Sequence, residues 1–221
     1  MSDKKEAVRI MSPVGRVTNH SLFEKDVYTD ERGHEAVPSY KIEMAFEPGD
    51  LEEFEDAIVD VAIDFFGGDA EVDYNEGRLR SPITDGDKMA EEREKRGKKG
   101  DAYRGKLVVR AKTIFNRDGT DGPGGVYVAS PEKDPKNPDQ ARALDFAEQG
   151  KVYNGCYGQI SVTLNPYNGI AGGLPGIGLY LNGFQLVKDG ERLRGSDPSS
   201  LFSPMMGKDS ESKGRRARGK K

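Results

Sequence analysis

The sequence predicts a mainly β protein that folds as a small, partly closed barrel with one or two short helices. Several segments alternate apolar and polar residues with the period of two that is typical of half-buried strands. Only two segments carry the spacing of an amphipathic helix. The connections between segments are long and rich in the chain's 28 glycines and 12 prolines. Several short strands and two short helices joined by such loops favour a small barrel.

The length and composition limit the class of protein further. The 221 residues allow one large domain or two small ones with a real core. No apolar run approaches the ~20 residues that a membrane helix needs, and the amino terminus has no signal-like stretch. The single cysteine, Cys156, cannot form an internal disulfide or a thiolate zinc site, and it fits a reducing compartment. We therefore expect a cytoplasmic protein without a metal or a membrane span.

The first strand with a clear pattern covers residues 40–46, where Tyr40 shares the apolar face. Tyr40 is therefore expected in the core. A helix is predicted over 51–65, because apolar residues recur there at helical spacing and two glycines follow. Asp50 and Glu53 have the spacing of a capping box at its start. The many carboxylates of this helix are expected to face water.

The middle of the chain combines a predicted surface loop with a strand. Residues 73–104 are charged and glycine-rich, so we expect a long loop there. The strand that follows covers 107–115, and its alternation directs Arg110 and Lys112 to one polar face. The opposite face carries the apolar residues Leu107, Val109, Ala111 and Phe115.

The second half of the chain is predicted to hold three strands, one short helix and a tail. A short strand is predicted over 126–129 and a short helix over 139–149, where a glycine follows. The most regular alternation lies in 152–164, which predicts a strand with one apolar face. A last strand is predicted over 179–188. After residue 195 the composition of Ser, Pro, Gly, Lys and Arg is typical of a disordered tail.

Charge is distributed unevenly along the chain, although the formal net charge is only −4. Residues 43–94 hold 18 acidic and four basic side chains, whereas residues 95–117 hold nine basic side chains and one acidic. The residues from 207 onward are basic again. With such an uneven distribution of charge, a protein can present a basic groove although its net charge is negative. Lysine runs are also common in plain solvated loops, so the pattern alone does not decide.

A single nucleic acid strand is bound by cations along its phosphates and by flat side chains on which bases stack. Arg110 and Lys112 supply such cations on one strand. Tyr153 and Tyr157 lie four residues apart on the polar side of another predicted strand and supply the rings. The alternative is that these tyrosines close the barrel. Cys156 falls on the buried face, where a thiol is inert.

The order of short motifs along the chain resembles the bacteriophage single-stranded DNA-binding proteins with an OB-type barrel. The motifs are Gly15-Arg16-Val17, Leu22-Phe23-Glu24, Tyr40 to Phe46, Pro82-Ile83, Asp85-Gly86-Asp87, Val109 to Lys112, Val152 to Tyr157, Asn165-Pro166-Tyr167, Gly176 to Asn182 and Gln185 to Glu191. The resemblance implies an OB-like five-stranded barrel over residues 1–195 and a flexible basic tail over 196–221.

The same resemblance implies a function and a set of contacts. The protein would coat single-stranded DNA without sequence preference during phage replication and recombination, with no cofactor. Its implied partners are single-stranded DNA and, beyond it, replication or recombination proteins; the oligomeric state stays open. The implied DNA contacts are Arg110, Lys112, Tyr153, Tyr157, Lys106 and Tyr167. Proteins of this type often end in an acidic tail, whereas this chain ends in basic residues.

Three alternatives remain open at this point. An adaptor would use the acidic residues 43–94 to recruit replication or recombination enzymes, with DNA binding secondary. A nuclease would hold a divalent metal at Asp85, Asp87 and His34, although a turn in an acidic loop is the commoner explanation. For the basic tail, finally, we expect the cations to attract phosphate, and the alternative is that the tail folds back on the acidic residues 43–94.

Overall fold

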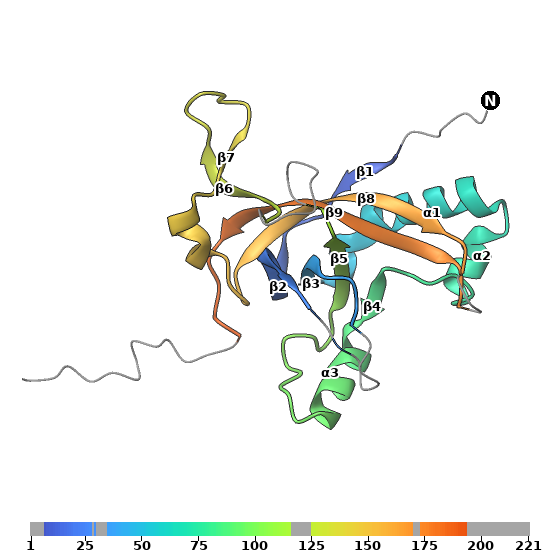
Figure 1. Cartoon of the computed structure of the whole chain (residues 1–221). Coiled ribbons are helices and arrows are strands. Elements are labelled where there is room, and N and C mark those ends of the chain that lie inside the picture. Colours follow the sequence, from blue (N-terminus) through green and yellow to red (C-terminus); the bar gives the residue numbers. More distant parts are fainter. Residues whose placement is uncertain (1–6, 28, 30–34, 116–124, 170–172, 194–221) are drawn as a thin grey trace, which may run out of the picture.

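A computed structural model describes residues 7–27, 29, 35–115, 125–169 and 173–193, and a ring of strands dominates it (Figure 1). The strands are β1 (Arg9–Met11), β2 (Gly15–Asp26), β3 (Ser39–Phe46), β4 (Ile83–Asp85), β5 (Leu107–Thr113), β6 (Tyr127–Lys133), β7 (Ala141–Ala143), β8 (Tyr157–Tyr167) and β9 (Gly176–Lys188). The helices are the 3-10 turns η1 (Pro48–Leu51) and η2 (Phe146–Lys151) and the α-helices α1 (Glu52–Phe66), α2 (Ala70–Asn75) and α3 (Gly86–Lys95).

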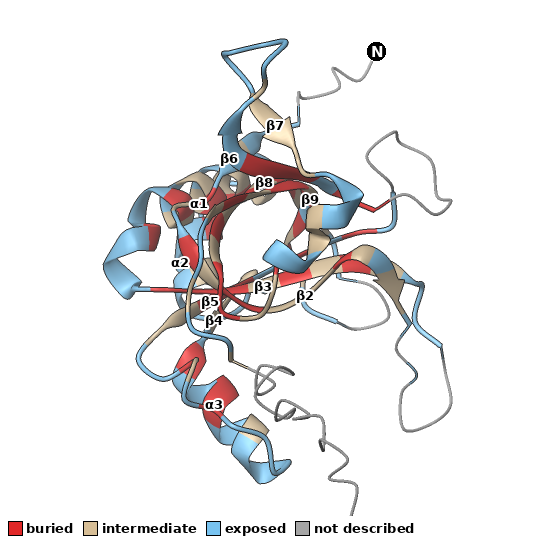
Figure 2. Cartoon of the chain, turned by 90° about the vertical axis from the view of Figure 1, so that its left-hand side faces the viewer, coloured by how far each residue is buried: buried red, intermediate tan, exposed pale blue. Residues whose placement is uncertain are grey.

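Five of these strands close on themselves in the order β8-β2-β3-β5-β9-β8 (Figure 2). Their contacts are antiparallel except between β5 and β9, which run parallel. The strand β1 extends the sheet beyond β8, and β6 with β7 extends it beyond β9. The predicted mainly β fold built around five strands is therefore confirmed.

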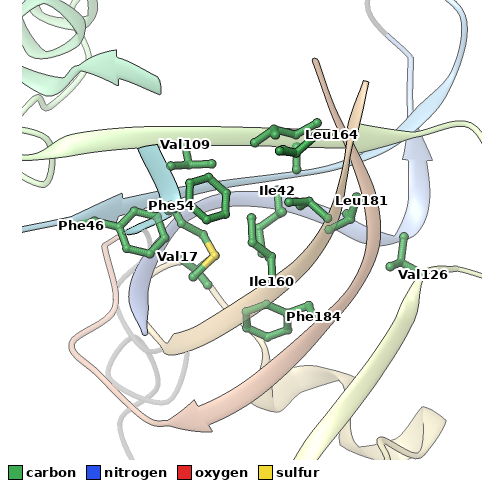
Figure 3. Packing of buried hydrophobic residues seen from close by; sticks show 14 of the residues in the cluster. Val17, Ile42, Phe46, Phe54, Val109, Val126, Ile160, Leu164, Leu181 and Phe184 are labelled. Carbon is green, nitrogen blue, oxygen red and sulfur yellow. The ribbon is translucent and has the colours of Figure 1, made fainter. Parts of the chain in front are cut away.

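The apolar faces of the ring strands meet inside the ring (Figure 3), and residues of α1 pack against this core. Side chains from β2, β3, β5, β8 and β9 supply most of this core, and α1 adds Phe54, Ile58 and Ala62. Tyr40 is buried there as predicted, and its hydroxyl accepts a hydrogen bond from the backbone N–H of Gly125. Cys156 is also buried, as predicted, and burial raises the pKa of its thiol.

The seam between β2 and β8 depends on two glycines. Gly15 and Gly158 are directly opposed in the register. A Cβ on Gly15 would lie 2.4 Å from the Phe46 ring, and one on Gly158 would lie 2.3 Å from the Phe184 ring. The missing side chains therefore leave room for two phenylalanine rings of the core.

The structure corrects several predicted elements. Residues 73–104 are not one loop, because they include the end of α2, all of β4 and all of α3. The helix α3 escaped detection because only Met89 and Ala90 among its ten residues are buried and apolar. Its start is fixed by Asp85, whose side chain accepts hydrogen bonds from the N–H groups of Asp87 and Lys88.

The predicted helix over 139–149 is also wrong. Those residues form β7 and the start of η2, because residues 141–143 pair with β6. Asp145 caps η2 in a capping box with Glu148, and the helical structure is limited to the six residues of η2. The capping box predicted at Asp50 is absent: Asp50 lies inside η1, and α1 begins without a side-chain cap.

Two further details differ. The strand predicted over 152–164 is shifted, since β8 begins at Tyr157 and continues to Tyr167. Phe115 is exposed rather than buried, because β5 ends at Thr113. The predicted tail over 196–221 and His34 lie outside the described residues.

Candidate nucleic-acid interface

The outer face of the ring is where the polar side chains of the alternating strands gather. Along β8, buried and half-buried residues alternate from Tyr157 to Leu164, with the half-buried side chains pointing away from the core. The strand β9 does the same from Ile177 to Leu181, so Tyr180 points outward and is 46% exposed. The sheet thus presents an aromatic ring to solvent between buried Leu179 and Leu181.

One row of residues paired across neighbouring strands runs over the outer face, and it contains this ring and several cations. Lys112 on β5 pairs with Tyr180 on β9, and Tyr180 in turn pairs with Thr163 on β8. At the two ends of the row, Lys41 pairs with Lys112 and Arg9 pairs with Thr163. Paired residues in a sheet project on the same side. Lys112 therefore lies beside the Tyr180 ring, with no ion-pair partner among the described residues.

Two more tyrosines lie in neighbouring rows of the same face. A Cβ on Gly178 would lie 3.8 Å from the Tyr167 ring, which places that ring over β9 one row before Tyr180. A Cβ on Gly183 would lie 3.6 Å from the Tyr127 ring, which places Tyr127 one row after. Successive rows on one face of a strand are about 7 Å apart.

A fourth tyrosine, Tyr157, occupies the same face at the start of β8. Its ring lies 4.8 Å from the Nζ atom of Lys188 and 6.0 Å from the Cζ atom of Arg16, measured to the ring centroid. Cations therefore already cover part of this ring. Tyr167, Tyr180, Tyr127 and Tyr157 together are called the tyrosine stripe below.

Between its rings, the tyrosine stripe is polar and uncharged. Thr163 and Asn182 hydrogen-bond to each other through their side chains, and so do Gln159 and Gln185. The cations Lys112, Lys188, Arg16 and Arg9 lie along its margins. Rings in the middle with cations at the edge are what a single strand of nucleic acid requires.

Tyr153 does not lie on the tyrosine stripe. It precedes β8, so the expectation that it shares a strand face with Tyr157 is wrong. Its hydroxyl donates to the carbonyl of Gly190 over 2.9 Å and accepts from the N–H of Gly190 over 3.1 Å. The guanidinium of Arg192 lies 4.0 Å from the centre of its ring. Tyr153 therefore anchors the segment that follows β9.

Arg110 is exposed, as predicted, but it is engaged in a network. Its Nε atom lies 2.7 Å from a carboxylate oxygen of Glu43, whose other oxygen accepts from Tyr103 over 2.7 Å and from Thr18 over 3.0 Å. Burial opposes the ionisation of Glu43, but these donors outweigh it and lower the pKa of its carboxyl. Burial, with the charge of Glu43, raises the pKa of Tyr103 to about 12.

The network attaches α3 to the ring. Tyr103 packs with Met89, Ala90 and Val108 in a small second core between α3 and β5. Arg110 is thus partly a structural residue. Lys106, another predicted contact, is ion-paired with Glu47 and lies at the opposite end of β5 from Lys112.

The carboxylates considered for a metal have structural partners instead. Asp85 caps α3, and an oxygen of Asp87 accepts from the N–H of Gly105 over 3.0 Å. Within the part of the chain that the structure describes, no three histidine, cysteine, aspartate or glutamate side chains are grouped as metal ligands. None of its helices is long and apolar enough to cross a membrane.

Of the predicted contacts, the structure brings Lys112, Tyr157 and Tyr167 to one face, together with two residues that the sequence analysis missed. The strands predicted over 179–188 and 126–129 contain Tyr180 and Tyr127, but neither ring is among the expected DNA contacts. The signal was present, because Tyr180 stands between two leucines and Tyr127 between two valines.

A ring of five strands with aromatic rings on its outer face and cations along the edges of that face is typical of proteins that bind a single strand of nucleic acid. The model of one protein family, described as the single-stranded DNA-binding protein of Enterobacter phage Enc34, matches residues 25–211. The chain belongs to this family. The adaptor alternative is not favoured by this membership.

Solved structures agree in fold. The single-stranded DNA-binding protein from bacteriophage Enc34 in complex with ssDNA is similar with a TM-score of 0.55 and 16% identity, over 88% of this chain and 97% of that one. The bacteriophage T7 protein gp2.5, a single-stranded DNA-binding protein, is similar with a TM-score of 0.50 and 13% identity, over 96% and 100% of the two chains. No curated protein matches by sequence.

Proposed function

We propose that this protein binds single-stranded DNA without sequence preference along the tyrosine stripe and coats it during phage replication and recombination. The observation that carries the proposal is the row in which Lys112 lies beside the exposed ring of Tyr180, with Tyr167 and Tyr127 in the adjacent rows. Membership of a single-stranded DNA-binding family supports it.

Each part of the surface has a role in this proposal. The rings of Tyr167, Tyr180 and Tyr127 stack with bases, which is tolerant of sequence because every base has a flat face. Lys112 and the other marginal cations contact phosphates, which supplies affinity without reading the sequence. The polar side chains between the rings hydrogen-bond to each other, which leaves few groups aimed at base edges.

The proposal treats the protein as a binding protein and not as an enzyme, acting in the cytoplasm of the host cell. Support comes from the family and from the structural roles of Asp85 and Asp87. Lys106, Tyr153 and Arg110 support DNA binding indirectly in this account, through the segments that they hold. The domain that binds DNA comprises residues 1–195.

A fluorescence-anisotropy titration tests the proposal, with labelled oligo-dT compared with a duplex of equal length. Tighter binding of oligo-dT is expected, because only a single strand offers unstacked bases. If about four phosphates are neutralised, the logarithm of the binding constant should fall with the logarithm of salt at a slope of roughly −3. Equal binding of both DNAs, or a slope near zero, would contradict the proposal.

A further inference from the structure

Acidic side chains without intervening lysine or arginine are concentrated in and around α1. No lysine or arginine occurs between Lys41 and Arg78, and α1 carries acidic residues along its whole length. Carboxylates in the first turn of a helix are stabilised by the helix dipole, whereas Asp64 in the last turn is not. The acidity of α1 therefore extends beyond the first turn, where the helix dipole stabilises carboxylates.

A cavity of about 600 Å³ lies between β1 and the start of α1. Its lining is divided: Ile10, Phe54 and Ala57 are apolar, whereas Asp50, Glu52 and Glu53 are acidic. The strand β1 is the last strand of the sheet on this side, so its outer edge is unpaired among the described strands. This space, called the β1–α1 groove, can accept an extended chain along a strand edge.

The acids of the β1–α1 groove lack counter-charges. Asp50, Glu52 and Glu53 are exposed and form no ion pair with any residue that the structure describes. Burial raises the pKa of the neighbouring Glu55, and the charges of Asp56 and Glu52 raise it further. Neighbouring carboxylates repel each other, and a cationic partner lowers the free energy of such a group.

We propose that the β1–α1 groove binds the carboxy-terminal segment of the same chain, residues 201–221. The segment has both kinds of chemistry that the groove requires, in order along the chain. Residues 201–206 are mainly apolar and include two methionines, which adapt to irregular apolar surfaces. Residues 207–221 hold seven basic and two acidic side chains.

The last described residues make this docking possible within one molecule. The N–H of Leu193 donates to the carbonyl of Asn154, near the start of β8, and the N–H of Ser12 at the groove donates to the carbonyl of Ile160. The chain from residue 154 to residue 160 spans at most about 20 Å. Residues 194–200 span up to about 25 Å when extended, so residue 201 can reach the groove.

In the β1–α1 groove, the basic segment lies away from the tyrosine stripe. Its cations then neutralise α1 and do not act as free phosphate contacts. The inference does not rest on the proposed function, because docking of the segment requires no DNA. It excludes the other expectation for the basic tail, in which its cations attract phosphate.

The test uses the full chain with a nitroxide label attached through Ser210→Cys. Cys156 is buried and stays unlabelled, so the label occupies one position. Paramagnetic broadening of backbone amide signals then reports what lies near residue 210. Several-fold loss of intensity is expected in residues 49–57 and 10–13, with little loss in α3. The loss should disappear near 1 M salt, where the Debye length is about 3 Å.

Two charge variants decide whether the groove is responsible. Glu52→Lys with Glu53→Lys should abolish the broadening. The control, Glu91→Lys with Glu92→Lys, makes the same change of charge on exposed residues of α3 and should leave it intact. Broadening that is spread over the surface, centred on the tyrosine stripe, or unaffected by the groove variant would overturn the proposal.

A mixed sample separates docking within one molecule from docking between copies. Spin-labelled chain without isotope is mixed with isotope-labelled chain without the spin label. The proposal predicts no broadening in this mixture. Broadening of residues 49–57 in the mixture would mean that the segment binds a second copy, which would overturn the intramolecular version.

Discussion

At the scale of single residues, the account depends on an exposed ring beside an unpaired cation. Tyr180 and Lys112 come from strands that are distant in sequence and adjacent in the sheet. A tyrosine ring stacks with a base while its hydroxyl remains in water, and an ammonium contacts phosphate as a point charge. The pair can therefore bind one nucleotide, with the ring against its base and the ammonium against its phosphate.

Replacing Tyr180 by alanine should weaken binding of oligo-dT, because a stacked base contributes about 1–3 kcal/mol. The melting temperature should stay the same, since the ring is 46% exposed. The control is Phe65→Ala, which removes a 48% exposed ring from α1 and should leave affinity unchanged. Anisotropy and thermal unfolding measure both effects, and a large drop in melting temperature for Tyr180→Ala would show that the ring is structural.

Lys112 and Arg110 should differ although they are two residues apart. Lys112→Gln should weaken binding to all sequences alike and flatten the salt slope by about 0.7 at an unchanged melting temperature. Arg110→Gln should lower the melting temperature, because it leaves the half-buried Glu43 without its ion pair. Salt titrations and thermal unfolding of both variants check this, and identical behaviour would contradict the assigned roles.

At the scale of elements, the Glu43 network attaches α3 to β5 and should make that attachment sensitive to pH. The pKa of Glu43 is lowered in the folded protein, so its stabilising contribution is present above the pKa of the unfolded chain. The contribution is lost as the pH falls through the lowered folded pKa. The protection factors of the α3 amides, taken relative to the intrinsic exchange rate at each pH, should therefore fall in acid.

The variant Glu43→Gln removes the titrating group and serves as the comparison. Its α3 amides should be less protected at neutral pH and should show a weaker pH dependence over the acid range. Hydrogen exchange followed by mass spectrometry measures both proteins. An unchanged pH dependence in the variant would assign the effect to another group.

Among the elements, the alternating strands were predictable from the sequence, whereas α3 and the extent of η2 were not. Strands with one apolar face were recognised, because alternation in 40–46 and 157–164 directly reflects burial on one side. The helix α3 was missed because its apolar contacts come from Tyr103 and Val108, outside the helix. The helix predicted over 139–149 is wrong because residues 141–143 pair with β6, and such a pairing is not encoded in the local pattern.

The candidate site was predictable to a lesser extent. Lys112, Tyr157 and Tyr167 were identified from strand alternation or from the family resemblance, and the structure places them on one face. The two leucines beside Tyr180 predict an exposed ring, but its position beside Lys112 follows only from the parallel pairing of β5 and β9. That contact joins strands separated by most of the second half of the chain. Such pairings depend on ring closure, which local patterns do not encode.

At the scale of the whole molecule, the fold places the apolar core, the tyrosine stripe and the acidic helix α1 in different parts of the structure. The apolar faces close inward, the tyrosine stripe lies on the outer face of β8 and β9, and the acidic helix α1 covers one side of the ring (Figure 2). An acidic α1 repels phosphate, so DNA is directed to the other faces. The net charge of −4 therefore does not oppose DNA binding.

Ultraviolet cross-linking to oligo-dT, read out by peptide mass spectrometry of the full chain, tests the central claim most directly. The account predicts cross-linked tyrosines in β8, β9 and β6, with Tyr180 among them. Cross-linking should decrease at high salt and should be absent from α1. Cross-links confined to α1, α2 or residues 95–106, with none on the tyrosine stripe, would contradict the account.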